Sequence, residues 1–346
     1  MHPRMCPGLS CLILAVCSTA MLAQQAALSS PPAPGRMYLD VVVTPKSGAP
    51  VSGLQQQDFT ILDNKAPQAI TSFAALGGPQ APIEVVLVVD TVNADLQTVT
   101  YERKLIDKFL KENDGQLAYP TSLAIFNDVR IAMADSPSKD GNQLSSVLDQ
   151  QNLGLRDTAK FSGPTGEADK QHLCLVAAQR LVVKEATRPG RKVILWVSPG
   201  WPLLSTANLN YDAQQSQMLF KQTVVMSTLL RRAGVTLYSI NPAGANEGSG
   251  QLDYEQFVKG ATKPSQTIPG FLGLQVLAVQ SGGLALTGNN DIASQLERCL
   301  ADFTAYYELS FDPPPGDRRD DYHTLQVKVS QPGLTARTRT GYYSQP

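Results

Sequence analysis

One carboxylate closes an apolar run in the stretch VVLVVDTVNADLQT. Asp90 follows the uncharged residues 85–89, and Asn93 comes three positions later. Carboxylate and amide oxygens can hold a divalent cation, and a carboxylate can also accept hydrogen bonds from the backbone of a following loop or helix start. If residues 83–90 form a strand of a parallel sheet, Asp90 lies beyond its carboxyl end, where such sheets bind their ligands.

A second candidate for chemistry is Ser198, which precedes a Pro-Gly turn after the apolar run KVILWVS. With His172 as its base, this serine would form the nucleophile–base pair of a hydrolase. The sequence contains no Gly-x-Ser-x-Gly elbow, Walker loop or Gly-x-Gly-x-x-Gly fingerprint. Serines before such turns are mostly turn residues, so we expect a protein that is not an enzyme and keep a cryptic serine hydrolase as an alternative.

The N-terminal residues predict export. Residues 1–23 combine Arg4, a short apolar core and small residues, which is typical of a cleaved secretory signal, and 24–36 form a Pro-rich tether. We therefore expect an extracytoplasmic protein, periplasmic or secreted, with no membrane span in the mature chain. The 29 basic and 30 acidic side chains give no net field that would attract nucleic acid.

Cysteine usage leaves one question open. Three of the five cysteines would leave with the signal, so five minus three gives two, Cys174 and Cys299. In an oxidising compartment they could form a disulfide, and two buried thiols on separate helices are the commoner outcome. Neither His172 nor His323 has the spacing of a closed zinc site with them.

The middle of the chain alternates between strand and helix patterns. Nearly continuous apolar runs such as IEVVLVVD and KVILWVS are expected of strands that are covered on both faces of a parallel sheet. Amphipathic segments such as YERKLIDKFLKEN and NNDIASQLERCLADF predict helices between them, the last one capped by Asn289 or Asn290. Residues 82–304 therefore predict an α/β domain with a doubly wound, mostly parallel sheet.

Both flanks of this region predict β structure. Residues 37–80 show period-two alternation broken by turns, which predicts three or four antiparallel strands, and 305–346 predict three more. Tyr306-Tyr307 and Tyr342-Tyr343 should alternate faces, with one tyrosine of each pair buried and the other exposed. Because a few strands with open edges are marginal alone, we expect the two flanks to pack together as one β-sandwich.

The chain resembles a von Willebrand factor A domain over about residues 83–303. In that family the first strand ends in Asp-x-Ser-x-Ser, and here Asp90 ends the corresponding run. The flanking blocks DFTILDNKAPQAITSF and the terminal GYY are similar to the VWFA-related family described from acidobacteria. The resemblance covers nearly the whole mature chain, and it implies a protein-interaction module.

The resemblance also implies a Mg²⁺ site, but this chain departs from the pattern. Val92 and Ala94 stand where the family has its two serines, and neither carries a side-chain oxygen. Asp90, Asn93 and Ser198 remain as candidate ligands, with a hydroxyl from Thr158, Ser162 or Thr165. We expect no cofactor, with Mg²⁺ as the alternative, and Asp90 hydrogen-bonded to its own loop or capping the next helix.

Trp201 and the long loop over residues 241–270 are the candidate partner-binding features. An exposed tryptophan at this edge of the sheet would anchor a partner, although burial of Trp201 against its own loop is equally compatible with the sequence. The expected function is recognition of a protein or cell-envelope partner without a metal. The alternative is Mg²⁺-dependent adhesion, in which the partner completes the coordination at Asp90.

Overall fold

The computed structural model describes residues 35–128, 130–150, 163–203, 211–242, 253–287, 291–314 and 318–345. The predicted signal, and the predicted tether up to residue 34, lie outside these ranges. Within the described ranges, no helix has the length and apolar content that crossing a bilayer requires.

A mixed sheet of seven strands forms the centre of the fold, in the order β11-β10-β9-β5-β6-β7, with β8 also paired to β6. Five strands are parallel: β5 (Ile83–Asp90), β6 (Gln116–Phe126), β9 (Arg191–Val197), β10 (Val235–Ile240) and β11 (Ala285–Leu286). The short strands β7 (Ile131–Met133) and β8 (Ser138–Asp140) run antiparallel to β6. The predicted α/β class and its mostly parallel sheet are confirmed.

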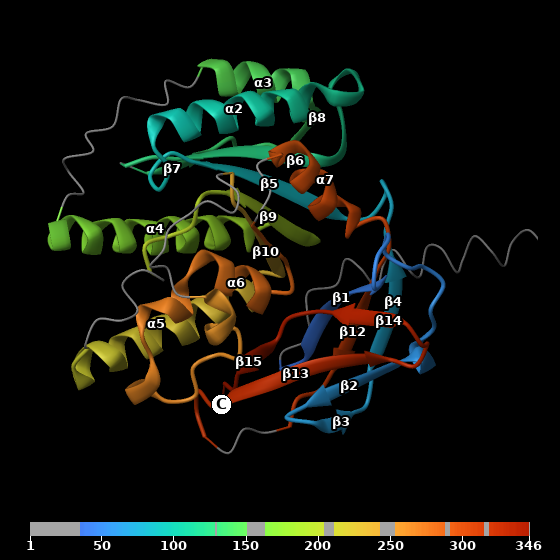
Figure 1. The fold of residues 1–346 in the computed structure, drawn as a ribbon. Helices are drawn as coiled ribbons and strands as arrows, with labels where there is room; N and C mark the ends of the chain where they lie inside the picture. Colours follow the sequence, from blue (N-terminus) through green and yellow to red (C-terminus); the bar gives the residue numbers. More distant parts are fainter. Residues whose placement is uncertain are drawn as a thin grey trace, which may run out of the picture. The chain divides into compact units, whose positions relative to one another are not determined.

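Helices cover both faces of this sheet, which explains why its strands are apolar on both sides (Figure 1). One face carries α2 (Leu96–Lys111), α3 (Gly141–Gln150) and α7 (Ile292–Ala301). The other face carries α4 (Gly163–Glu185), α5 (Ala213–Arg232) and α6 (Leu274–Gln280). Cys174 and Cys299 lie in the apolar clusters of opposite faces, and both are free thiols.

The cap of the last helix differs from the prediction. Asp291, and not Asn289 or Asn290, is the N-cap residue of α7, and its carboxylate accepts a hydrogen bond from Ser294 N at 3.3 Å. The helix therefore begins later than the sequence pattern predicted. Asp and Asn are nearly equivalent caps, so composition alone could not choose among three consecutive candidates.

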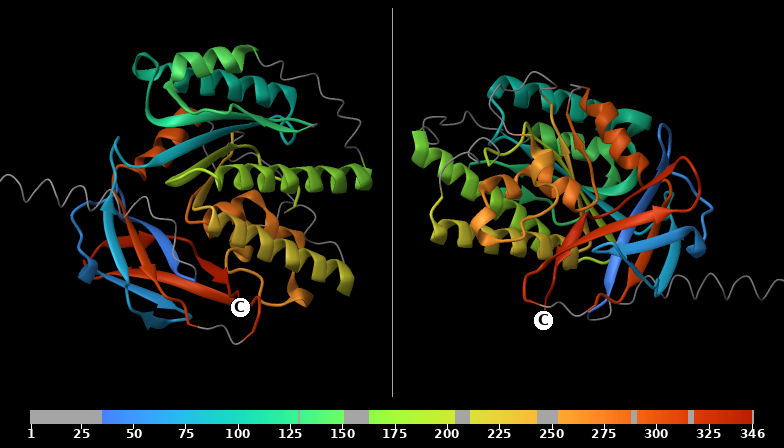
Figure 2. Two further views of the ribbon diagram at one scale, coloured as in Figure 1. Left: turned by 180° about the vertical axis from the view of Figure 1, so that it is seen from behind. Right: turned by 60° about the horizontal axis from the view of Figure 1, so that its bottom comes forward.

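Strands from the two ends of the chain pair with each other in two four-stranded antiparallel sheets (Figure 2). The first sheet has the order β14-β1-β12-β4, from β14 (Leu334–Arg337), β1 (Met37–Pro45), β12 (Tyr306–Phe311) and β4 (Ser72–Leu76). The second has the order β15-β13-β2-β3, from β15 (Gly341–Tyr343), β13 (Tyr322–Val329), β2 (Phe59–Asp63) and β3 (Ala66–Gln68). The expected meeting of the two flanks is confirmed.

The two antiparallel sheets share one apolar core. Leu39 and Val41 of β1 pack in the same cluster as Ile61 of β2 and Val327 of β13. The C-terminal flank supplies four strands, and not the predicted three. The last segment divides because β14 pairs with β1 in one sheet while β15 pairs with β13 in the other.

Tyr306 and Tyr307 lie on opposite faces of β12 as predicted, but the prediction that one tyrosine of each pair is exposed is wrong. Tyr306 and Tyr307 are 2% and 1% exposed, and Tyr342 and Tyr343 are equally buried. Tyr307 packs in the core of the antiparallel sheets, whereas Tyr306 packs with the helical face that contains α2, α3 and α7. The prediction assumed that one face of each strand meets water, and β12 has no such face.

Candidate functional site

The strand order places the predicted site at the point where the sheet reverses direction. From β5, the chain adds β6 on one side and then returns to add β9 on the other. Asp90 ends β5, and the pairing of Val89 with Val197 brings Asp90 alongside Ser198, the residue after β9. Asp90 and Ser198 thus occupy the switch point at which open α/β sheets bind ligands.

The carboxylate of Asp90 is fully buried and accepts four hydrogen bonds. Its Oδ1 accepts from the backbone N–H of Val92 at 2.9 Å and of Asn93 at 3.0 Å. Its Oδ2 accepts from Asn93 Nδ2 at 2.8 Å and from Trp196 Nε1 at 3.0 Å. The expected bonds to the following loop are present. The alternative role as a helix cap belongs to Asp95, which accepts from Thr98 N.

These contacts determine whether Asp90 can bind a divalent ion. A carboxylate has about four lone-pair positions, and the four donors around Asp90 use that number. Val92 and Ala94 are buried and bring only hydrocarbon, and Asn93 directs its amide nitrogen toward the acid. Mg²⁺ needs several oxygen ligands in a near-octahedral arrangement, and this donor set does not fit one.

Ser198, the third candidate ligand, is buried, and its hydroxyl accepts a hydrogen bond from Gly200 N at 3.1 Å. Thr158 and Ser162 lie outside the described residues, as does the side chain of Thr165. Among the residues that the structure describes, no cluster of three or more His, Cys, Asp or Glu side chains could hold a metal ion.

Two partners of this site could not be predicted from the local sequence. Trp196 reaches Asp90 from the neighbouring strand, 106 positions along the chain. Cys174 of α4 lies beneath the loop, and Asn93 Nδ2 donates to its Sγ at 3.3 Å. The only available signal was the position of Trp196 near the carboxyl end of a predicted neighbouring strand.

Trp201 is 1% exposed, so the structure shows burial and not an exposed anchor, and the side chain packs in the apolar cluster that includes α4, α5 and α6. Its ring meets Trp196 edge to face, with centroids 5.1 Å apart. Gly200, before it, has a φ of +118°, and a Cβ there would come within 2.6 Å of Gln275 Nε2. Only glycine suits that position, and Trp201 offers almost no surface to a partner in this conformation.

The structure does not bring together Ser198 and His172, the pair predicted for the hydrolase alternative. Ser198 is buried within its turn, while His172 is exposed on α4, and these two described residues form no hydrogen bond with each other. A nucleophile and its base must lie within hydrogen-bond reach.

The predicted binding edge over residues 241–270 is only partly described, because residues 243–252 lie outside the structure's described ranges. Residues 253–272 form three short 3-10 turns that pack around Phe257 and Val276. Both the N–H and the carbonyl of Ala261 are bonded to the Tyr343 hydroxyl of β15. This described part is therefore tied to the C-terminal strand β15.

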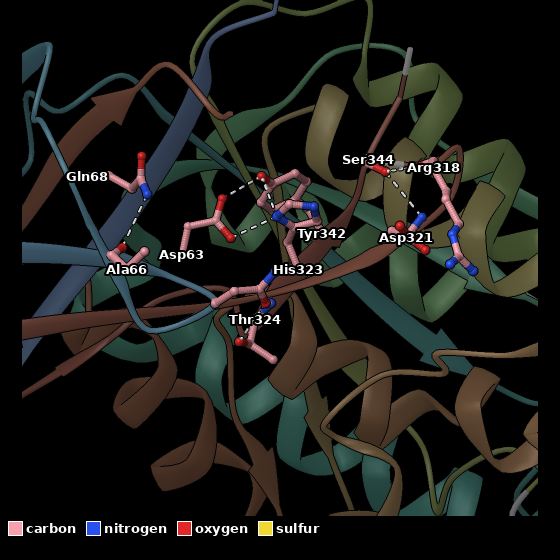
Figure 3. A network of polar contacts seen from close by, with 10 residues as sticks. Asp63, Ala66, Gln68, Arg318, Asp321, His323, Thr324, Tyr342 and Ser344 are labelled. Carbon is pink, nitrogen blue, oxygen red and sulfur yellow. Dashed lines mark hydrogen bonds and ion pairs between the residues drawn. The ribbon is translucent and has the colours of Figure 1, made fainter. Parts of the chain in front are cut away.

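A second buried polar cluster lies in the antiparallel sheet that contains β2, β13 and β15 (Figure 3). Asp63 Oδ1 lies 2.9 Å from His323 Nδ1, and Asp63 Oδ2 accepts from the Tyr342 hydroxyl at 2.7 Å. The rings of His323 and Tyr342 are stacked with centroids 4.8 Å apart. All three side chains are partnered by one another, which identifies the cluster as a cross-strand brace.

No protein-family model and no curated protein matches the sequence. Among solved structures, the chain is similar to proximal thread matrix protein 1 from the mussel byssus (14% identity, TM-score 0.37, covering 70% of this chain and 51% of that one). It is similar to the PilB minor pilin from Streptococcus sanguinis (12%, 0.39, 65% and 62%). It is also similar to the manganese-loaded TRAP protein from Plasmodium vivax (10%, 0.37, 78% and 97%).

The match therefore spans about half the length of the mussel protein. Each of these TM-scores is below 0.5.

Proposed function

We propose that this protein is an exported, non-enzymatic interaction module of the von Willebrand factor A type that binds a protein or cell-envelope partner without a metal ion. In this proposal the two antiparallel sheets form a β-sandwich into which the A-type domain is inserted. The supporting features are the central position of β5 in the sheet, the switch point beside it and the acid that ends that strand.

One observation carries the proposal. Asp90 lies at the carboxyl end of β5, but its two carboxylate oxygens already accept hydrogen bonds from four protein donors. A site that waits for an ion must present free oxygen lone pairs toward solvent or toward a ligand. Here the acid instead fixes the loop of residues 91–94, of which Thr91, Val92 and Ala94 are buried. In this proposal the fixed loop holds the exposed residues 95–97, at the start of α2, in a single arrangement for a partner.

Calorimetric titration of the mature chain with Mg²⁺ and Mn²⁺ tests the metal part of the proposal. We expect no saturable heat at Asp90, and the Asp90→Ala variant should give the same trace as the unmodified chain. Tight binding that disappears in Asp90→Ala would overturn the proposal in favour of Mg²⁺-dependent adhesion.

The interaction part is tested by using the mature chain as bait for envelope extract, in parallel with EDTA and with Mg²⁺. The same partner should be retained under both conditions, and retention that requires Mg²⁺ would contradict the proposal.

Generic esterase and peptidase assays complete the test, with Ser198→Ala as control. A turnover that is lost in Ser198→Ala would show an enzyme.

A further inference from the structure

A cavity of about 360 Å³ opens at the amino edge of the central sheet, the edge opposite Asp90. Its volume lies within the roughly 300–1,000 Å³ of small-molecule pockets. Its walls come from the end of α2, the start of β6 and the end of α7, and we call it the amino-edge cavity. The apolar part of the wall consists of Phe109, Leu117, Ala118, Leu300 and Ala301.

Two acids, Glu112 and Glu297, lie in the same wall, one after α2 and one on α7. Among the described residues, no lysine or arginine forms an ion pair with either carboxylate. Burial, and then the neighbouring Glu297 carboxylate, raise the pKa of Glu112, although Lys108 acts in the opposite direction. The two negative charges are therefore close enough to oppose each other, and a cation between them would relieve that repulsion.

Tyr119 adds a polar group to the wall of the cavity. The residue lines the cavity and is 5% exposed, and its ring meets Phe303 edge to face. Within the described part of the chain, its hydroxyl makes no hydrogen bond. The hydroxyl is not sealed from solvent, so it can donate to or accept from a polar group that enters the cavity.

The cavity also adjoins both connections between the α/β region and the antiparallel sheets. Gly78 and Pro79 follow β4, Thr304 precedes β12, and all three residues line it. The connections touch each other, because Gly78 N donates to Phe303 O at 3.0 Å. A Cβ at Gly77, whose φ is +141°, would collide with the carbonyl of Thr304. A molecule bound here would contact both crossings at once.

We propose that the amino-edge cavity binds small amphiphilic amines, with the apolar chain along Phe109, Leu117 and Leu300 and the ammonium group between Glu112 and Glu297. The apolar wall favours a hydrocarbon chain, and the two acids favour a cation over a neutral or anionic head group. This binding is separate from partner recognition at the opposite edge, so the two proposals stand or fall independently.

The test uses the mature chain labelled with ¹³C at alanine methyl groups, because Ala118 and Ala301 both lie in the wall. It is titrated by NMR with n-octylamine, 1-octanol and octanoate, each below the concentration at which it self-associates. Octylamine should bind tightest and should shift the Ala118 and Ala301 resonances first. Equal affinity for 1-octanol or octanoate, or saturation without shifts at these two residues, would overturn the proposal.

The variant Glu112→Gln/Glu297→Gln should weaken octylamine binding by roughly threefold to tenfold, since partly exposed charge pairs contribute modestly. Binding of 1-octanol should not change. The matched control is Asp114→Asn, which removes an exposed charge near the cavity but outside its wall. Unchanged octylamine affinity in the double variant would contradict the proposal.

In the unmodified chain, higher ionic strength should weaken octylamine binding and leave 1-octanol binding unaffected. Octylamine affinity that does not fall with ionic strength would also contradict the proposal.

Discussion

A single buried carboxylate organises the loop at the carboxyl edge of the central sheet. Asp90 receives two backbone N–H groups, one amide and one indole N–H, which together close the turn after β5. Hydrogen bonds to a charged acceptor are stronger than neutral ones, and a buried charge is tolerated only with such partners. Asp90 therefore stabilises the loop that connects β5 to α2 at the proposed recognition edge.

Replacing the charge while keeping the shape tests this role. Asp90→Asn should lower the free energy of unfolding by about 1–3 kcal/mol. The new amide nitrogen is itself a donor, and in either orientation it would face two donors and accept from neither. Trp196→Phe removes one of these donors, so the double variant should lose less than the sum of the two single variants. Chemical denaturation of the four proteins measures this coupling.

The control for this cycle is Asp212→Asn. Asp212 caps α5 by accepting from Gln215 N at 2.8 Å, and asparagine caps a helix almost as well as aspartate. Its unfolding midpoint should stay close to that of the unmodified chain. Purely additive effects of Asp90→Asn and Trp196→Phe would show that the contact between them adds nothing.

At the scale of elements, β12 is the strand that joins the two parts of the fold. One side of β12 presents Tyr307 to the core of the antiparallel sheets, where its hydroxyl donates to Val51 O at 2.8 Å and accepts from Leu54 N at 3.1 Å. The other side presents Tyr306 to the cluster of α2 and α7. Both faces of this strand are therefore core.

Truncation of either tyrosine should be costly. Tyr306→Ala and Tyr307→Ala should each lower the free energy of unfolding by about 3–5 kcal/mol, the range for large buried aromatic side chains. Tyr101→Ala is the matched control, because this tyrosine of α2 is 43% exposed, and its effect should stay within about 1 kcal/mol. Thermal and urea unfolding provide the comparison. A nearly neutral Tyr306→Ala would support the exposed tyrosine that the sequence predicted.

The tyrosines show which kinds of burial sequence patterns can predict and which they cannot. Runs such as residues 83–90 and 191–197 are apolar at nearly every position, so burial on both faces could be predicted from them alone. The alternating flanks predicted most of the strands and their pairing across the chain, but not the division of the last strand into β14 and β15. Burial of the outer face of β12 depends on contact with helices far away in sequence, and no local period records that contact.

The candidate site also has some features that the sequence predicted and others that it could not. The place of Asp90 at a strand end, and its bonds to the next loop, followed from the order of residues. The indole of Trp196 and the thiol of Cys174 reach the site from other elements, and only the folded chain brings them there. Burial of Trp201 could not be decided beforehand, because one aromatic residue in a loop suits either an anchor or a core.

At the scale of the whole described unit, buried charges link the α/β region to the antiparallel sheets. Arg191 at the start of β9 forms an ion pair with Asp40 of β1 at 3.1 Å, and its guanidinium lies 4.5 Å from the ring centroid of Tyr306. Arg337 of β14 pairs with Asp302 just after α7. These contacts span the boundary between the two regions, so their charge state affects the whole unit.

Glu308 makes this boundary sensitive to pH. It stands directly opposite Asp40 in the β1–β12 pair, and like charges in that position repel. Burial, and then the Asp40 carboxylate, raise the pKa of Glu308 to about 7, although Arg191 acts in the opposite direction. Because this pKa is higher in the folded chain than its ordinary value of 4.5, the folded state holds the proton more tightly. The stabilisation from Glu308 is therefore complete below about pH 4.5 and is lost as the pH rises through about 7.

Glu308→Gln should remove this dependence, since glutamine keeps the neutral shape at every pH. At about pH 8 the variant should exceed the unmodified chain in unfolding free energy by about 1–2 kcal/mol, and at about pH 5 the difference should be much smaller. Urea unfolding at both pH values measures the change, with the exposed Glu255→Gln as control. If the difference in unfolding free energy between Glu308→Gln and the unmodified chain were the same at both pH values, Glu308 would not titrate across this range. The arginine–acid contacts would then hold the two regions together independently of pH.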